Sequence, residues 1–195
     1  MIGKKNTVAK LSELEASTKD YFEKLPGYDT LRMILAKSSI LVEGPSDELI
    51  IQRAYLDLNG NLPIEDGIDV IAVRGLSFKR FLDIAALLKI ITSVVTDNDG
   101  DYQKNVIERY ESYTTNTNIK IYGSENEAYK TLEPQIVNSN ELALLNSILE
   151  TNFADKPALI DHMMKNKTDC ALKIFNSDKK IVFPEYVTNA ITREE

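Results

Sequence analysis

Short apolar runs alternate with amphipathic helical patterns through most of the chain, and this alternation restricts the fold more than any other feature. The runs predict four strands, at residues 39–42, 69–73, 90–96 and 118–122. Because helical patterns separate them, the strands are expected to lie parallel, with helices on both faces of one sheet. The predicted fold class is α/β, a Rossmann-like parallel sheet flanked by helices and followed by a mostly helical C-terminal part.

The length of 195 residues suits one compact domain with additions at its ends. We divide the chain into a helical connector or tail at residues 1–36, an α/β core at 37–130, and a helical extension at 131–195 that completes the site. The first 24 residues carry only a thin apolar stripe. They are therefore expected to pack on another element rather than to fold alone.

Acidic residues gather where the predicted strands end. The candidate metal ligands are Glu43, Asp47, Asp97, Asp99, Asp101 and Glu133. In an open parallel sheet, ligands bind beyond the carboxyl ends of the strands. Carboxylates gathered there repel one another unless a cation neutralises them, and oxygen-only ligands suit Mg²⁺ or Mn²⁺. A single acid is more often a helix cap or a solvated charge. The conjunction of Glu-Gly-x-x-Asp after one strand and Asp-x-Asp-x-Asp after another favours a metal site.

Other site types that use acidic residues fit less well. Asp97–Glu108 has acids at four positions of a calcium EF-hand loop, but Tyr102 stands where the loop needs glycine, and a strand precedes it. Phospho-receiver domains carry adjacent acids after their first strand, and haloacid-dehalogenase-like phosphatases carry Asp-x-Asp there. This chain has Glu-Gly-x-x-Asp after its first predicted strand, and its aspartate trio follows the third. None of the eight glycines begins a phosphate-binding G-x-x-x-x-G-K-[ST] loop, which argues against a nucleotide-powered enzyme.

The charge of the chain is uneven. The net charge of −7 argues against non-specific binding of polyanions, but residues 156–180 hold six lysines against three aspartates. Metal ions that neutralise the carboxylates would still allow a nucleic acid to bind. The lysines that we expect to contact phosphates are Lys165, Lys173, Lys179 and Lys180. For any one of them, a place on a solvated helical face is the more frequent role.

Cysteine and histidine are nearly absent. Cys170 and His162 are the only residues of their kinds, which excludes an intrachain disulfide, a cysteine zinc cluster and a multi-histidine metal site. No apolar run approaches the ~18 residues that span a bilayer, and no signal-peptide pattern opens the chain. We expect a reducing, cytoplasmic setting and no membrane partner.

The strand-end motifs resemble those of the Toprim domain, which topoisomerases, bacterial primases and some nucleases share. They read Leu-Val-Glu-Gly-Pro-Ser-Asp at residues 41–47 and Asp-Asn-Asp-Gly-Asp at 97–101. Further segments resemble the OLD (overcoming lysogenization defect) nucleases, in a class 2-like form. These segments are residues 25–32, 40–49, 131–133, 167–172 and 183–187.

The resemblance implies a DNA endonuclease that hydrolyses phosphodiesters with two divalent cations, Mg²⁺ or Mn²⁺. Glu43, Asp97 and Lys167 would be catalytic, with Lys167 stabilising charge in the transition state. Glu43 and Asp47 would hold one ion, the two ions would share Asp97 and Asp99, and Glu133 would complete the set. Asp101 matches the third acid of topoisomerases.

The resemblance also implies partners. OLD proteins usually carry an ABC-type ATPase before the Toprim domain, and no such domain is visible here. The first 24 residues look like the tail of a removed or separately encoded ATPase. DNA and that ATPase are the expected partners, and phage defence is the implied setting. The alternative is a catalytically silent or partner-dependent Toprim module that binds nucleic acid or the ATPase.

Overall fold

Four parallel strands form one sheet in the order β2-β1-β3-β4. The computed structural model describes residues 10–24, 27–73 and 78–194. The strands are β1 (Ser38–Val42), β2 (Ile68–Ala72), β3 (Ile91–Val95) and β4 (Ile119–Tyr122). Every predicted strand is confirmed to within about one residue at each end, because short β-branched runs between helical patterns favour buried parallel strands.

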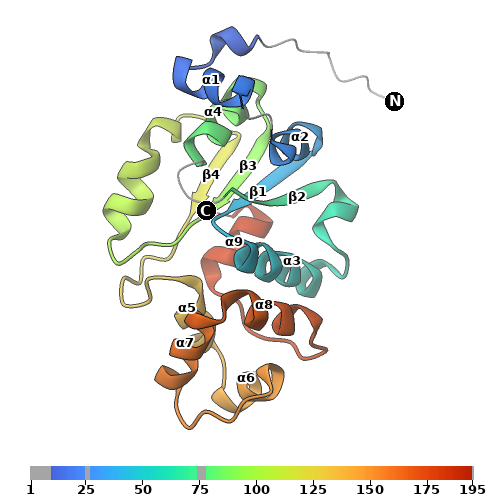
Figure 1. The fold of residues 1–195 in the computed structure, drawn as a ribbon, viewed down its shortest axis with the longest axis vertical. Helices are drawn as coiled ribbons and strands as arrows, with labels where there is room; N and C mark the ends of the chain where they lie inside the picture. The colour runs from blue at the N-terminus through green and yellow to red at the C-terminus, as the bar shows by residue number, and fades with distance from the viewer. Residues whose placement is uncertain (1–9, 25–26, 74–77, 195) are drawn as a thin grey trace.

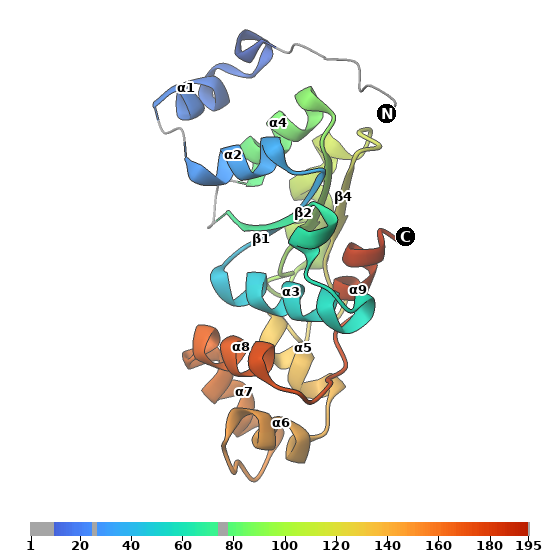
Figure 2. The ribbon, with the colours of Figure 1, turned by 90° about the vertical axis from the view of Figure 1, so that its right-hand side faces the viewer.

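Helices cover both faces of the sheet, as the alternation predicts (Figures 1 and 2). On one face, α2 (Tyr28–Leu35) and α4 (Phe78–Leu88) pack in a core that includes Leu41. On the other, α3 (Pro45–Asn59) and α9 (Glu185–Thr192) share a core with Ile40 and Val42. Neighbouring residues of β1 enter opposite cores because successive side chains of a strand point to opposite faces.

The C-terminal part is helical, as predicted, and lies beyond the carboxyl ends of the strands (Figure 1). Its helices are α5 (Leu132–Ser139), α6 (Leu142–Leu149), α7 (Lys156–Lys165) and α8 (Lys167–Asn176). Helix α8 packs along α3, and the chain then returns to the sheet, where α9 packs beside β3 and β4. One continuous buried cluster joins sheet residues such as Val42 to Ile174 of α8. None of the described helices is both long and apolar enough to cross a membrane.

The N-terminal helix α1 (Ala16–Lys24) packs on α4. The Thr18 hydroxyl lies 2.6 Å from a carboxylate oxygen of Asp83, and the Arg80 guanidinium lies 4.1 Å from the centre of the Tyr21 ring. The expectation that this segment packs on another element therefore holds for the described part of it, and the other element belongs to the same chain. Residues 1–9 and 25–26, which the sequence analysis assigned to this region and to the family motif, lie outside the described residues.

Short helical turns complete the described structure. They are η1 (Leu11–Glu13), η2 (Pro63–Asp66), the π-helical η3 (Gln103–Glu108) and η4 (Glu111–Tyr113). The sequence predicts one regular helix around residues 102–110, whereas η3 is wound more loosely there. Such π-helical turns are rare and occur often at functional sites.

Candidate functional site

Glu43 joins the ends of two neighbouring strands. It follows β1 directly, and its Oε1 accepts hydrogen bonds from the Thr96 hydroxyl (2.8 Å) and the Asp97 backbone N–H (3.1 Å). These groups meet because β1 and β3 pair in parallel and therefore end at the same edge of the sheet. The structure thus brings two of the predicted site residues, Glu43 and Asp97, side by side.

Asp47 lies in the first turn of α3, directly beyond this point. Its Oδ2 accepts a hydrogen bond from the Gly44 N–H at 2.9 Å, which caps the helix. Carboxylates are stabilised at helix N-termini, where the backbone N–H groups lack partners. The same bond directs Asp47 toward the end of β1, where Glu43 lies.

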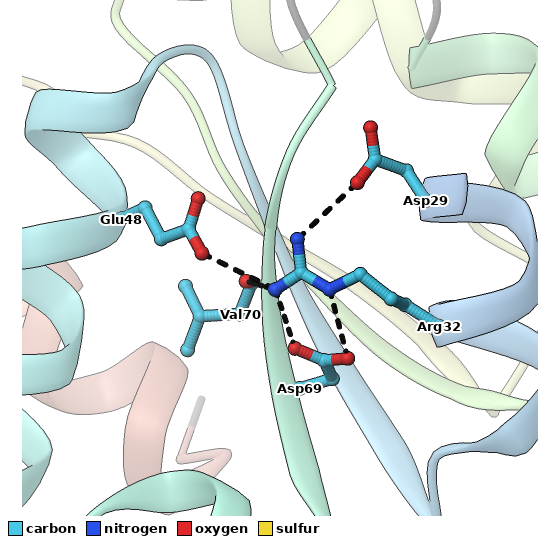
Figure 3. Close-up of polar contacts among 5 residues, drawn as sticks. All are labelled: Asp29, Arg32, Glu48, Asp69 and Val70. Atoms are coloured by element: carbon cyan, nitrogen blue, oxygen red, sulfur yellow. Dashed lines mark hydrogen bonds and ion pairs between the residues drawn. The ribbon is translucent and has the colours of Figure 1, made fainter. Parts of the chain in front are cut away.

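Arg32 ties α2 to the start of α3 and to the edge strand β2 (Figure 3). Its guanidinium contacts both carboxylate oxygens of Asp69, at 3.1 and 2.7 Å, and the Val70 carbonyl at 2.7 Å. It also pairs with Asp29 and Glu48, each at 3.2 Å. Burial alone would lower the pKa of Arg32, but the bonds and charges of Asp69 and Glu48 raise it overall. The cluster anchors the turn of α3 that carries Asp47.

We expect Arg32→Met to lower the free energy of unfolding by about 1–3 kcal/mol, because it leaves Asp69 and Glu48 without their counter-charge. The Arg32 side chain is only 22% exposed, so water replaces it poorly. Urea denaturation of the purified chain measures the change. Lys19→Met, which breaks an exposed pair with Glu23, is the control and should change stability by less than about 0.5 kcal/mol. Equal effects of the two substitutions would contradict the role given to Arg32.

Asn98 holds the loop that follows β3. It is fully buried, and its Nδ2 donates to the carbonyls of Ser124 (2.8 Å) and Asn126 (3.0 Å). Its Oδ1 accepts from the Gly100 N–H at 2.8 Å. These bonds set the position of the Asp97 backbone and attach the loop to the segment after β4.

The remaining two acids of the Asp-x-Asp-x-Asp trio are exposed. Asp99 has a positive φ of 51°, and Asp101 accepts a hydrogen bond from the Lys104 N–H at 3.0 Å, at the start of the following helix. Gly100 lies between them with φ of +85°, a backbone conformation that strains any residue with a Cβ, so the turn favours glycine. The structure therefore separates the trio into one half-buried carboxylate and two solvated ones.

Glu133 and Lys167 form an ion pair from the C-terminal helices. Glu133 lies in the first turn of α5 and is 5% exposed. The Lys167 Nζ lies 2.9 Å from its Oε1 and 3.0 Å from its Oε2, and the Thr131 hydroxyl lies 2.8 Å from Oε2. Burial lowers the pKa of Lys167, but the bond and charge of Glu133 raise it above its usual value overall.

Four carboxylates act on one another across this region. Burial, and then the charges of Glu43, Asp47 and Glu133, raise the pKa of Asp97 to about 8, which Lys167 partly opposes. Burial, and then the charges of Glu133 and Glu43, raise the pKa of Asp47 to about 6. Without a cation, Asp97 is therefore mostly protonated near neutral pH.

Oxygen-only donors of this kind suit hard divalent cations, and a cation would relieve the repulsion that raises both pKa values. Among the residues that the structure describes, no three acidic, histidine or cysteine side chains stand close enough to share one metal ion. A cavity of about 10 Å³ borders Asp47, Glu133 and Lys167, which is room for roughly one water molecule. The oxygen donors of these carboxylates suit a divalent metal ion. In the described structure the carboxylates are too far from one another for three of them to bind the same ion.

The lysines expected to contact phosphates lie on the helical extension, and most have partners within the chain. The paired ones are Lys165 with Asp161 (2.7 Å), Lys173 with Glu150 (2.9 Å) and Lys179 with Ser147 (2.7 Å). Lys180 is exposed and makes no hydrogen bond or ion pair with a described residue. Of the four, Lys180 is the most available to a phosphate.

Tyr186 is a residue at this site that the sequence analysis did not assign a role. It lies in the first turn of α9, is 8% exposed, and borders a cavity beside the carboxylates. Burial, and then the charges of Asp97, Asp47 and Glu133, hold its pKa well above the usual value. No spacing in the chain links residue 186 to residue 97, so only the return of α9 to the sheet reveals their proximity.

Comparisons with known proteins identify similar sequences and structures. Residues 34–99 match the family model described as "Overcoming lysogenization defect protein-like, TOPRIM domain". A search of the curated proteins found no match.

Three solved structures of the C-terminal region of the Xanthomonas campestris pv. campestris OLD protein resemble the chain. The one phased with platinum has a TM-score of 0.61 at 16% identity and covers 83% of this chain and 93% of its own. Those phased with iodine and mercury have TM-scores of 0.60 and 0.58 at 16% and 18% identity. Each covers 82% of this chain, and 94% and 95% of its own, respectively. At these identities the likeness establishes a shared fold.

Proposed function

We propose that the chain, whose residues 34–99 match the OLD-like Toprim family model, is the catalytic part of a divalent-metal-dependent DNA endonuclease. One observation carries the proposal. Glu43, Asp47, Asp97 and Glu133 come from separate segments to one end of the sheet, where burial and mutual repulsion raise the pKa of Asp97 to about 8. Repelling acids of this kind in a cleft are more often functional than structural.

The same four carboxylates would hold two Mg²⁺ or Mn²⁺ ions, and Asp99, on the loop after β3, would be a further ligand. Such ions acidify an attacking water and stabilise the leaving oxygen of a phosphodiester. Glu43 uses its Oε1 for two hydrogen bonds, and its Oε2 would accept the proton of that water. We assign Asp101 to the helix start, because its carboxylate already accepts the Lys104 N–H.

Lys167 would bind the scissile phosphate. In the described structure its ammonium neutralises Glu133, so it lies at the edge of the carboxylate group with its charge retained. On the pentavalent phosphorane that charge would be worth about 2–4 kcal/mol. Lys180, together with Lys165, Lys173 and Lys179 once released from their partners, would contact further phosphates without reading sequence.

Cleavage of supercoiled plasmid tests the proposal. The purified chain should yield nicked or linear DNA with Mg²⁺ or Mn²⁺ and none with EDTA. We expect Lys167→Met to slow cleavage by about 30- to 1000-fold, the equivalent of the energy above. Lys19→Met, a matched change at an exposed lysine of α1 that has no proposed role in DNA binding, should change the rate by less than about threefold.

The outcomes separate the candidate functions. Equal rates for the two lysine variants would remove Lys167 from the mechanism. Wild-type protein that leaves the plasmid intact with every metal would favour the alternative, a catalytically silent or partner-dependent Toprim module, and adding an ABC-type ATPase would be the next experiment.

A further inference from the structure

A second recess adjoins the carboxylates without containing them. It has a volume of about 730 Å³ and lies among the segment after β4, the start of η3 and helix α9. The lining residues that matter here are Tyr102, Glu125, Asn126, Glu185, Tyr186 and Asn189. Volumes of this order are typical of pockets for small organic ligands, including a nucleoside.

Two sets of contacts join the recess to the candidate site. Tyr186 lines the recess and also experiences the charges of Asp97 and Asp47. The backbone of Ser124 and Asn126, which forms one wall, is held by the Asn98 side chain, whose neighbours in sequence are Asp97 and Asp99. A strand whose phosphate reaches the carboxylates would therefore have an adjacent nucleoside at the mouth of the recess.

The charge of the recess disfavours a second phosphate. Glu125, Glu185 and Glu194 line it, against a single cation, Lys120, whose ammonium already donates to the Arg193 carbonyl at 3.1 Å. Anions approaching three carboxylates are repelled. The ligand is therefore neutral or carries N–H donors that carboxylates can accept.

The remaining polar groups suit a flat ligand with both donors and acceptors. The side-chain amide of Asn189 makes no hydrogen bond with a described residue, and the same holds for Nδ2 of Asn126. Amides of this kind pair with the edges of nucleobases, and partly exposed tyrosine rings such as that of Tyr102 stack on their faces. Unpaired nucleobases combine these properties with neutrality.

We propose that this recess binds one unstacked nucleobase of the DNA strand, next to the phosphate held at the carboxylates. The inference rests on the proposed function and adds a substrate preference to it. Extruding a base from a duplex costs a few kcal/mol, so single-stranded, mismatched or damaged DNA would be preferred over intact duplex. Asn189 and the Tyr102 ring determine the preference, and neither belongs to the catalytic set.

Binding of short oligonucleotides tests this without turnover. Fluorescence anisotropy with Ca²⁺ compares a labelled single-stranded 12-mer of mixed sequence with an abasic 12-mer of equal charge. We expect the wild-type chain to bind the base-bearing strand about tenfold more tightly, as stacking of one base predicts. Asn189→Leu and Tyr102→Leu should each reduce that ratio to about threefold or less. Asn152→Leu and Tyr28→Leu are matched changes at exposed positions outside the recess and should leave it unchanged.

Each outcome decides one proposal. Equal affinities for the two strands, no binding of either, or a ratio that survives both recess variants would overturn the base site. Plasmid cleavage that persists in such a case would leave the proposed function standing. A base preference that depends on Asn189, in a chain that cuts nothing with any metal, would support the recess and overturn the nuclease.

Discussion

Asp97→Asn should stabilise the metal-free protein and abolish its proposed activity. Asn carries no charge, so the substitution removes the repulsion from Glu43, Asp47 and Glu133 while keeping the size of the side chain. We expect the free energy of unfolding at pH 8.5 in EDTA to rise by about 1–3 kcal/mol. Cleavage should fall by at least about 1000-fold, because in the proposed mechanism Asp97 would be a ligand of both ions.

The stability of the metal-free chain should also depend on pH, and the pKa of Asp97 sets the direction of that dependence. The pKa of Asp97 is about 8 in the folded protein and near 4 when unfolded, so the folded state binds its proton more tightly. Between these two values the metal-free chain should lose stability as pH rises, and Asp47, with a pKa of about 6, adds to the loss at the lower end. Urea denaturation at pH 5, 7 and 8.5 measures it. Asp97→Asn should flatten the slope, and Asp178→Asn, at an exposed aspartate, should not. A slope that is unchanged in Asp97→Asn would show that this carboxyl is ionised in the folded protein.

Arg53→Met should strongly destabilise the folded chain while leaving the carboxylates of the candidate site intact. Arg53 of α3 is 5% exposed and donates from Nη1 to the carbonyls of Ile174 and Phe175, both at 2.9 Å, and to that of Ser177. Its Nη2 donates to the Lys179 carbonyl at 3.0 Å. These carbonyls belong to the last turn of α8 and the segment beyond it, where helical partners are lacking.

The substitution also removes the partner of a nearby acid. Arg53 pairs with Asp57 at 3.0 Å, and Oδ2 of that carboxylate is buried with no hydrogen bond to a described residue. Breaking a buried pair in this way costs about 3–5 kcal/mol. Thermal and urea unfolding measure the loss, and Lys180→Met, at an exposed lysine, is the control. The double variant Arg53→Met/Asp57→Asn should recover part of the loss, since it leaves no unpaired charge. A loss below about 1 kcal/mol for Arg53→Met would mean that α8 holds its place by apolar packing alone.

Local patterns account for the strands and for part of the site. The β-branched run before Asp97 and the Glu-Gly-x-x-Asp segment after β1 predict strand ends, and parallel pairing brings those ends together. The division of the Asp97–Asp101 trio could not be predicted, because spacing alone does not distinguish a carboxylate that faces its neighbours from one that caps a helix.

Contacts across the chain explain what local patterns missed. Arg53 and Ile174 are 121 residues apart, and Tyr186 meets the carboxylates only because α9 returns to the sheet. Only family resemblance pointed to Lys167, and its pairing with Glu133 joins α8 to α5, which share one buried core. Pairings of this kind arise from tertiary packing, for which a single sequence carries no periodic signal.

The late return of α9 also bears on how the protein is made. During synthesis the sheet strands emerge first, and the acids at their ends emerge before the helix that seats Tyr186 beside β3 and β4. A nascent chain that stops at the ribosome exit before residue 192 therefore holds repelling carboxylates without the last layer of its core. The candidate site is therefore complete only after this segment has been synthesised, because Tyr186 takes its place beside the carboxylates only when α9 packs on β3 and β4.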